Sequence, residues 1–498
     1  MTGFRESAES ILSRLEQLRA HDAPTHGGRV LSYVYDTGSQ ELDALAGAAI
    51  AAMQPVNGLD PTTFGSVAAL ERDLVGFVRE LLHGDAQVVG SVTSGGTESC
   101  LLAVKTARDG WLAARGLEPG QARPRLVAPV TVHAAFRKAA AYFGLELDLA
   151  PVGPDGRPEA AELGRRMGED VALVVVSAPS YPHAALDPVV EVAALAEAAG
   201  IPVHVDACIG GLVLPFWDAA GPEGAEPLPL WDFRVPGVTS VSADLHKYGY
   251  APKGASVLLQ RPRDRQRHQY FAVTDWPGYP VVNATLLGSK SGGPLAAAWA
   301  IVQALGPEGF AELAHRCRRA TERLRATIAG IEGLRVVGEP VGPLFAVATD
   351  ESVPEPARVD PHHWADAARE LGWILQPQPG APQPDGSRLP PTTHLTVTPV
   401  TDSVLDELGP ALVRAADAVR GVPRADVSGL LAGLPPLEGP LDSDTALALL
   451  GGFGIGEGGG ALPERMAPLV AAIEALPAPV AERLLTELLA RLVEPRAG

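Results

Sequence analysis

Lys247 is the residue of this chain best placed for covalent chemistry, because it follows His246 in a short segment between two predicted strands. Residues 238–242 alternate and are rich in β-branched side chains, and residues 254–259 are largely apolar, as expected for strands. A lysine held at the end of a rigid strand can lose its proton and condense with an aldehyde. An isolated His-Lys pair would more often be a solvated hairpin, so other parts of the chain must decide.

Asp206 closes a second predicted strand. The preceding run, Ile201 to Val205, is mostly apolar, and a carboxylate in this place would lie at the carboxyl edge of a parallel sheet, where ligands bind in α/β folds. Such an acid can keep a pyridine nitrogen protonated, so that the ring accepts the electron pair released when a bond at a substrate Cα breaks. The alternative role is an ordinary acidic cap at a strand end.

A glycine turn between a strand and a helix predicts a phosphate-binding site. Residues 88–93 indicate the strand, Ser94 to Thr97 form the turn, and the apolar spacing after Glu98 is typical of a helix. Small residues let N–H groups at the helix start approach an anion, and a hydroxyl of the turn can add a donor. Such turns are common, so this motif is weak alone. The three features together suit pyridoxal phosphate.

The chain resembles fold-type I pyridoxal-phosphate enzymes of the group II decarboxylase superfamily, and within it the sphingosine-1-phosphate lyase branch. The resemblance rests on six segments that follow one another in the expected order. They are 93–99 (TSGGTES), 132–139 (VHAAFRKA), 177–188 (SAPSYPHAALDP), 204–211 (HVDACIGG), 233–253 (FRVPGVTSVSADLHKYGYAPK) and Asp275-Trp276 with 288–293 (GSKSGG).

This resemblance implies a set of cofactor contacts. Lys247 would carry the Schiff base, Asp206 would pair with the pyridine nitrogen, and His133 would stack on the ring. The phosphate would be held by Ser94, Gly95, Gly96, Thr97 and His246. Ser289 would reach the phosphate of the neighbouring subunit's cofactor, which implies a homodimer with shared active sites. Without the family, His133 could equally be a helix cap.

The resemblance also implies substrate contacts. Tyr181 would assist proton transfer beside a small-molecule amino substrate, although packing is an alternative role for it. Lys253 would bind an anionic group, and Tyr35 and Asn57 would contribute to the same pocket. Two positions depart from the lyase pattern. Asp60 stands where a histidine is usual and Lys290 where an arginine is usual, which makes a phosphorylated substrate less secure.

We expect a carbon–carbon lyase that acts at Cα and releases an aldehyde in retro-aldol fashion. The bond at Cα that is held perpendicular to the ring is the one that breaks. If the pocket holds a carboxylate there in place of Cβ, CO₂ leaves, so an amino-acid α-decarboxylase on the same scaffold is the alternative. An aminotransferase and a non-catalytic protein that binds pyridoxal phosphate are less favoured, because Lys247, Asp206 and His133 are all present.

Composition excludes several other classes. Lysine plus arginine at 40 against aspartate plus glutamate at 59 gives a net charge of −19, which argues against nucleic-acid and anionic-membrane partners. No apolar run approaches the roughly 20 residues that span a bilayer. The start lacks an apolar signal core, and three widely spaced cysteines suggest a reducing cytoplasm. The histidine spacing indicates no metal site. Residues 454–459 match GxGxxG, but no strand precedes them, so we reject a dinucleotide site.

Alternating strands and helices predict an α/β fold with a doubly wound, mainly parallel sheet and a smaller α+β domain. We expect an N-terminal arm over 1–60, with an amphipathic helix that wraps the partner subunit, and a large pyridoxal-phosphate domain over 61–305. A smaller C-terminal domain over 306–420 and a helical extension over 421–498 complete the chain. Two further segments are interpreted as irregular: 376–391 as a proline-rich loop, and 261–268 as a solvated basic turn or dimer contact.

Overall fold

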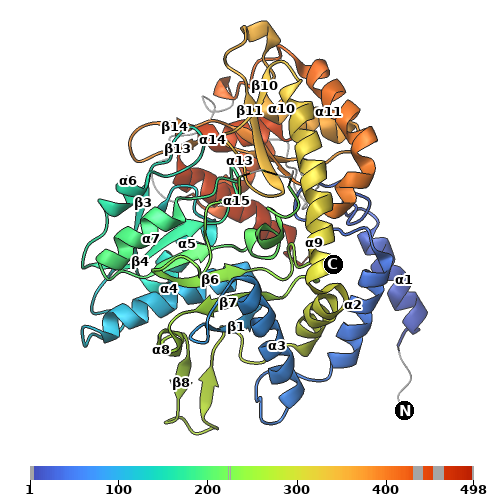
Figure 1. Cartoon of the computed structure of the whole chain (residues 1–498). Helices are drawn as coiled ribbons and strands as arrows, with labels where there is room; N and C mark the ends of the chain where they lie inside the picture. The colour runs from blue at the N-terminus through green and yellow to red at the C-terminus, as the bar shows by residue number, and fades with distance from the viewer. Residues whose placement is uncertain (1–4, 222–223, 225, 430–440, 453–464, 496–498) are drawn as a thin grey trace.

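A seven-stranded sheet forms the centre of the larger part of the molecule (Figure 1). The computed structural model describes residues 5–221, 224, 226–429, 441–452 and 465–495. The strands lie in the order β1 (Val89–Thr93), β7 (Ser256–Gln260), β6 (Val238–Ala243), β5 (Val203–Asp206), β4 (Val171–Ser177), β2 (Arg125–Pro129) and β3 (Glu146–Ala150). β7 alone runs opposite to the other six strands of this sheet, so the predicted mainly parallel sheet is confirmed.

Helices cover both faces of this sheet, which explains its sequence. Every residue of β4 is buried, as expected for a parallel strand packed on both sides. Val174 and Val176 face one apolar cluster, and Val175 between them faces another. The covering helices are α3 (Gly65–Leu81), α4 (Gly96–Ala113), α5 (Ala134–Phe143), α6 (Ala160–Gly164) and α7 (Val189–Ala198).

The smaller domain is built on a four-stranded antiparallel sheet. Its strands lie in the order β10 (Leu334–Val336), β11 (Leu344–Thr349), β15 (Thr392–Thr396) and β12 (Gln376–Gln378). The helices α10 (Pro361–Glu370) and α11 (Leu405–Val419) pack on it, and the buried Trp364 indole donates to the carbonyl of Leu412 at 3.0 Å.

The prediction of an irregular loop over 376–391 is wrong. Its first residues form β12, which pairs with β15, and its middle forms a small hairpin of β13 (Ala381–Pro382) and β14 (Arg388–Leu389). The segment 261–268 is also more ordered than expected. It contains α8 (Arg263–Arg267), and the Arg261 guanidinium donates to the carbonyls of Phe233, Val235 and Val238.

One long helix joins the two domains. Helix α9 (Gly292–Ala329) packs on α2 (Gln40–Met53) near its start and enters the core of the smaller domain near its end. Gly306, at φ 56° and ψ −178°, breaks the helical geometry, and Pro307 follows it. The kink therefore lies at the position where the sequence indicates the change from one domain to the other.

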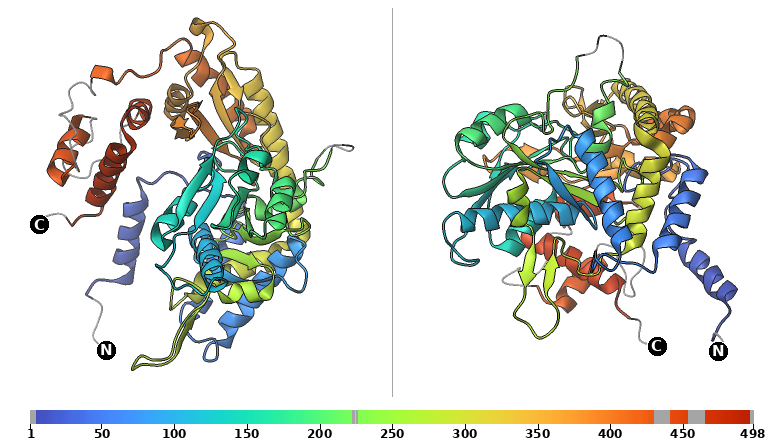
Figure 2. Two further views of the ribbon diagram at one scale, coloured as in Figure 1. Left: turned by 90° about the vertical axis from the view of Figure 1, so that its left-hand side faces the viewer. Right: turned by 60° about the horizontal axis from the view of Figure 1, so that its bottom comes forward.

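Two elements project from the body (Figure 2), and both carry exposed apolar side chains. Helix α1 (Ala8–Arg19) buries none of its residues, and its apolar face ends in Leu18, which is 70% exposed. The hairpin of β8 (Phe271–Val273) and β9 (Val281–Asn283) carries exposed Phe271, Tyr279 and Val282.

The C-terminal extension is helical where it is described, with α13 (Ser443–Gly452), α14 (Ala467–Ala475) and α15 (Ala478–Leu492). These helices share their own apolar cluster, which includes Ala446, Leu469 and Leu484, and α14 packs on α10 of the smaller domain. The GxGxxG match at 454–459 lies outside the described residues. Among the described helices, none combines the length and the apolar character needed to cross a bilayer.

Candidate active site

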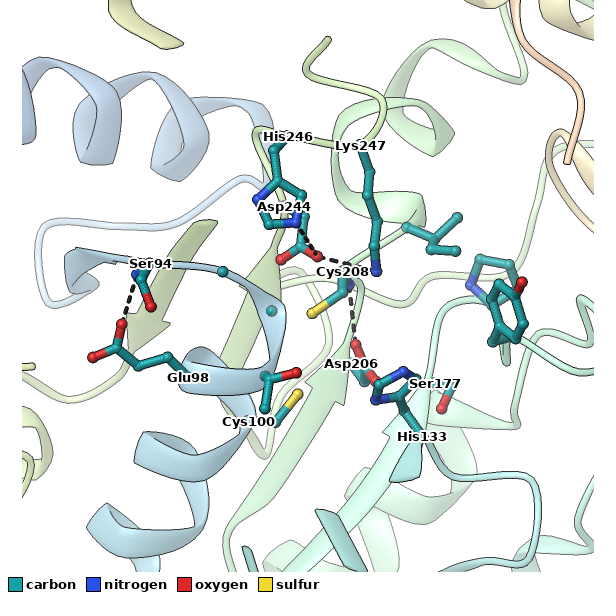
Figure 3. A pocket seen from close by; sticks show the side chains of 16 residues that line it. Ser94, Glu98, Cys100, His133, Ser177, Asp206, Cys208, Asp244, His246 and Lys247 are labelled. Atoms are coloured by element: carbon teal, nitrogen blue, oxygen red, sulfur yellow. Dashed lines mark hydrogen bonds and ion pairs between the residues drawn. The ribbon is translucent and has the colours of Figure 1, made fainter. Parts of the chain in front are cut away.

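A cavity of about 370 Å³ lies at the carboxyl ends of β4, β5 and β6, beside the first turn of α4 (Figure 3). Parallel strands bring their carboxyl ends to one edge of a sheet, so residues far apart in sequence meet there. The residues predicted from the sequence that line this cavity are Ser94, Gly95, Gly96, Thr97, His133, Tyr181, Asp206, His246 and Lys247.

Lys247 lies in the turn between β6 and β7, with its ammonium 3.0 Å from Oδ2 of Asp244. His246 Nε2 lies 3.5 Å from the same oxygen. Burial acts to lower the pKa of Lys247, but the nearby negative charges, that of Asp244 first, together outweigh it, and the pKa is raised well above its ordinary value. The side chain is held inside the cavity, so the solvated-hairpin alternative does not describe it.

The turn before α4 forms the opposite wall of the cavity. Ser94 and Thr97 are exposed there, and Glu98 is buried behind them. A Cβ at Gly96 would lie only 2.5 Å from Asp244 Oδ2, so a glycine is required for the turn to approach the lysine loop this closely. The Glu98 carboxylate accepts the N–H groups of Ser94 at 2.6 Å and of Leu286 at 2.5 Å.

Asp206 is buried at the end of β5, and its Oδ1 accepts the N–H of Cys208 at 3.1 Å. The Ser242 hydroxyl lies 3.5 Å from the same oxygen and 3.2 Å from Nε2 of His204. His204 Nδ1 in turn lies 2.9 Å from the Ser240 hydroxyl. A chain of polar groups on β5 and β6 therefore orients the Asp206 carboxylate.

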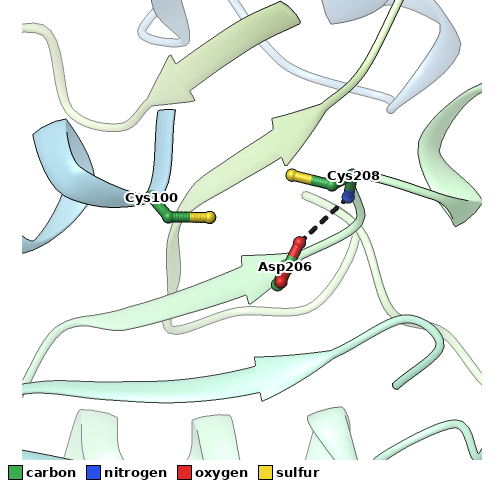
Figure 4. A group of neighbouring side chains, drawn as sticks. All are labelled: Cys100, Asp206 and Cys208. Carbon is green, nitrogen blue, oxygen red and sulfur yellow. Dashed lines mark hydrogen bonds between the residues drawn. The ribbon is translucent and has the colours of Figure 1, made fainter. Parts of the chain in front are cut away.

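Two buried thiols flank Asp206 (Figure 4). The Cys100 and Cys208 sulfurs and a carboxylate oxygen of Asp206 all lie within 4.8 Å of one another. Burial raises the pKa of Cys100, and a hydrogen bond with Cys100 together with burial raises the pKa of Cys208. Both thiols therefore favour the protonated form beside the Asp206 carboxylate.

A second cavity of about 670 Å³ opens beside the first and shares His133, Tyr181 and Lys247 with it. Tyr35 and Lys253 line this outer cavity, and the Lys253 ammonium lies 4.7 Å from the centre of the Tyr35 ring. Among the described residues that line it, none carries a carboxylate. Because Asp244 balances the charge of Lys247, Lys253 is the lysine of this lining that carries a positive charge toward the cavity, in a chain of net charge −19.

Tyr181 and His133 stand where the two cavities meet. The Tyr181 ring stacks on His394, with 4.4 Å between the ring centres, and burial raises the pKa of its phenol above the ordinary value. His133 is the N-cap of α5, because its Nδ1 accepts the N–H of Ala135 at 3.2 Å. The helix-cap role is therefore present together with the cavity position, and Nε2 is the ring nitrogen left for other partners.

Two predicted site residues, Asn57 and Ser289, and the two departures from the lyase pattern, Asp60 and Lys290, do not line either cavity of this chain. Asn57 pairs with Ser291 in an isolated bridge, and Ser289 is exposed close by. Asp60 accepts hydrogen bonds from Thr62 and Thr63 in an exposed turn, which lowers its pKa to about 2. Lys290 is buried and binds Glu71 Oε2 at 2.8 Å and the Val92 carbonyl at 2.9 Å.

Several site residues were missed from the sequence. Asp244 lies three positions before Lys247, inside the segment already singled out, but its role needs the fold of the turn. Tyr33, whose hydroxyl bonds to the Gln376 side chain, lies two positions before Tyr35. Gln376 and Gln378 line the outer cavity from the smaller domain. The sequence predicted an irregular loop there, and no motif in it marked the two glutamines as site residues.

The inner cavity has the donor set that pyridoxal phosphate requires. Lys247 offers the amine, Asp206 the carboxylate for a ring nitrogen, and the α4 turn with His246 the phosphate donors. The buried Asp244 carboxylate balances the charge of the lysine until the amine is used. The residues present therefore fit this cofactor.

Comparison with known proteins agrees with this geometry. The family model described as the pyridoxal-dependent decarboxylase conserved domain matches residues 6–346. A second model, described as a C-terminal putative HTH domain of pyridoxal-dependent enzymes, matches residues 425–491.

Two relatives and one solved structure are similar over most of the chain. The sphingosine-1-phosphate lyase of Oryza sativa subsp. japonica is 33% identical over 441 residues, which cover 86% of this chain and 77% of the rice protein. Sphingosine-1-phosphate lyase 1 of Rattus norvegicus is 36% identical over 345 residues, 69% of this chain but only 59% of the rat protein. The structure of a sphingosine-1-phosphate lyase from Burkholderia pseudomallei K96243 matches with a TM-score of 0.75 at 33% identity and covers 84% of this chain and 93% of that one.

Proposed function

The chain belongs to the pyridoxal-dependent decarboxylase family, and we propose that it is a carbon–carbon lyase that cleaves the Cα–Cβ bond of an anionic amino alcohol to release an aldehyde. Pyridoxal phosphate is its cofactor, and when bound it supplies the electron sink for a bond broken at the substrate Cα. The observation that carries the proposal is the outer cavity, where Lys253 adds a positive charge beside Lys247 and no described lining residue adds a negative one.

This lining suits a substrate that ends in a phosphate or another anion. Lys253 binds that group as a point charge, and Tyr35 holds the lysine in place through its ring face. The chain is similar to sphingosine-1-phosphate lyases, whose name states a phosphorylated amino alcohol as their substrate. Asp60, whose charge would repel such a substrate in the pocket, does not line the outer cavity of this chain.

The remaining residues hold or move protons. Tyr181 lines both cavities with its phenol protonated, since burial raises the pKa, and this position assigns it the proton transfer beside the reacting carbon. In a retro-aldol cleavage a base of the cavity, Lys247 or His133, takes the β-hydroxyl proton, the Cα–Cβ bond breaks with its electron pair left on the Cα side, and Cβ leaves as the aldehyde carbon. Cα then takes a proton, and the product keeps the amino group.

A product analysis tests this function. The enzyme with its cofactor is incubated with sphingosine-1-phosphate, with unphosphorylated sphingosine, and with plain α-amino acids, and aldehyde and CO₂ are both quantified. We expect aldehyde from the phosphorylated substrate, with a much lower kcat/KM for the unphosphorylated one. Exclusive release of CO₂ from amino acids would make the chain a decarboxylase, which is the second activity of the same scaffold.

We propose in addition that two copies of the chain form a homodimer with shared active sites. The exposed apolar side chains of α1 and of the β8–β9 hairpin supply surface for a partner. The Glu98 carboxylate accepts the N–H of Ser94, in the turn that lines the chain's own cavity. It also accepts the N–H of Leu286, three positions before the exposed Ser289. Sedimentation at micromolar concentration tests this state, and a monomer with full activity would contradict it.

A cytoplasmic location is the third part of the proposal. Cys100 and Cys208 lie close together beside Asp206 and are free thiols, and a reducing compartment keeps such a pair reduced. Fractionation of the native host with an antibody against the chain tests the location. Recovery in a secreted or periplasmic fraction would contradict it.

A further inference from the structure

The outer cavity has a wall that comes from the smaller domain. Gln376, Gln378, Ala381 and Leu389 line the cavity on this side, and all belong to the segment 376–391, which we call the wall segment. Its start pairs with β15, and the Gln378 side chain donates to the carbonyl of Pro182, next to Tyr181, at 3.0 Å. Where this segment lies therefore decides how much room a substrate has beside Tyr181.

The C-terminal extension holds the middle of the wall segment. Glu474, near the end of α14, accepts the N–H of Gly380 at 2.9 Å through Oε2. The same oxygen bonds to Arg424, and Oε1 lies 3.5 Å from Arg388 at the far strand of the small hairpin. The Glu474 side chain is only 11% exposed, so these contacts are largely withdrawn from water.

Gly380 is fitted to this contact. A Cβ at this position would lie 2.8 Å from Glu474 Oε1 and 2.9 Å from the Leu389 carbonyl, which is too close for any side chain. The peptide therefore approaches the carboxylate directly. Burial would raise the pKa of Glu474, but the hydrogen bonds from Arg424 and Gly380 outweigh it and lower the pKa, so the acid stays ionised.

Helix α14 is also fixed at its other end. The Asp366 carboxylate on α10 accepts the N–H of Met466 at 2.8 Å and that of Ala467 at 2.9 Å. A carboxylate at a helix N-terminus satisfies free amides and matches the helix dipole. The position of Glu474 is thus set by a helix anchored to the core of the smaller domain.

The charges of the extension do not suit nucleic acid. In the described part of α13 to α15 and their flanks, 441–452 and 465–495, the basic residues are Arg465, Arg483 and Arg491, and each pairs with a carboxylate. A nucleic-acid surface needs cations that are free to meet phosphates. A structural role toward the rest of the chain fits the contacts better.

We infer that the C-terminal extension is a working part of the substrate site, in which Glu474 holds the wall segment in place and so helps to determine which substrates the outer cavity accepts. The inference rests on the proposed function, because it takes the outer cavity as the place of the substrate chain. Glu474 does not touch the cofactor side of the site, so it is a positioning residue.

Hydrogen exchange and kinetics on the full-length holoenzyme test this role. Glu474→Ala removes the acceptor of the Gly380 amide and leaves two guanidinium groups without their partner, whereas Glu474→Gln keeps one acceptor oxygen. Glu370→Ala is the matched control, since Glu370 joins α10 to the extension through an exposed pair with Arg465 at 2.9 Å, away from the wall segment. Exchange is followed by mass spectrometry in peptides that cover 376–391.

For Glu474→Ala we expect exchange in the wall segment to accelerate by about 10-fold or more, the scale of a charged hydrogen bond. KM for phosphorylated amino alcohols should rise by about 5-fold or more, with kcat less affected and with the cofactor absorbance near 420 nm unchanged. Glu474→Gln should lie between this variant and the wild type, and Glu370→Ala should match the wild type.

Two results would overturn the inference: unchanged exchange in 376–391, or faster exchange with KM unchanged across substrates of different chain length. Failure of the proposed function gives a different result, because the wild-type enzyme itself would then release no aldehyde. Exchange in the peptides that contain Gly380 would still show whether Glu474 holds the wall segment. If Glu474→Ala fails to fold, Glu474→Gln and Gly380→Ala provide the same comparison.

Discussion

The Lys247 ammonium lies 3.0 Å from the Asp244 carboxylate, and both groups are held in one turn at the floor of the inner cavity. Because Asp244 raises the pKa of the lysine against the effect of burial, the amine is charged over a wide pH range. Attachment of an aldehyde requires the neutral amine, so this pair controls when the lysine can react.

Asp244→Asn should therefore shift the attachment of pyridoxal phosphate to lower pH. Without the carboxylate, burial dominates and lowers the pKa of Lys247, so the neutral amine becomes available earlier as the pH rises. The measurement is the amount of borohydride-trapped pyridoxyl group as a function of pH. An identical midpoint in the variant and the wild type would show that Asp244 does not govern the lysine.

Lys247→Ala should abolish the trapped adduct and the absorbance near 420 nm, and should reduce kcat by on the order of 10³-fold or more. The matched control is Lys253→Gln, which removes a neighbouring lysine of the same loop. Peptide mapping of the borohydride-treated protein distinguishes them. A pyridoxyl group found on Lys253, or on no lysine of the loop, would remove the basis of the site.

Lys253→Gln should raise KM for a phosphorylated substrate by roughly 10-fold to 100-fold, as expected when one charged hydrogen bond is lost. KM for an uncharged amino alcohol should change little, since that substrate offers no anion to Lys253. Steady-state kinetics with the two substrates side by side give the comparison. Equal effects on both would place the anion elsewhere.

His204 should make the protein less stable in acid. Burial lowers the pKa of this histidine to about 4, whereas the unfolded chain takes up the proton near the ordinary value of 6.5. A lowered folded-state pKa contributes stability that is present above pH 6.5 and is lost as the pH falls toward 4, on the order of 3 kcal/mol.

Thermal unfolding at several pH values between 7.5 and 4.5 measures this effect. In His204→Asn the loss of Tm on acidification should be smaller than in the wild type. Some loss should remain, because His183 and His394 are also buried with lowered pKa values, to about 4 and about 3. Parallel curves for the two proteins would assign the acid sensitivity to other groups.

The central sheet was predictable because its strands are short apolar runs that end in polar residues. β4 and β5 illustrate this, and Asp206 follows directly from it. The cofactor cavity was predictable for the same reason: strand ends meet at one edge, so the positions 94–97, 206 and 247 had to converge.

The outer cavity was less predictable, because its wall depends on pairings without a local signal. β12 contains Pro377, which argues against a strand in sequence but is tolerated here because β12 is the edge strand of its sheet. Gly380 and Glu474 are 94 positions apart, and nothing in either segment indicates the other. Asn57 and Ser289 were predicted from the resemblance alone, and neither lines the inner or the outer cavity of the single chain.

The wall segment and Glu474 lie outside residues 6–346, the stretch that contains Lys247, Asp206 and the phosphate turn. The bond-breaking groups are thus encoded in one part of the gene, together with Tyr35 and Lys253 of the outer cavity, and the wall segment with Glu474 in another. On the inference drawn for Glu474, exchange of the C-terminal third among relatives is expected to alter the range of accepted molecules and to leave the reaction unchanged, so that third is the place to begin when redirecting the enzyme.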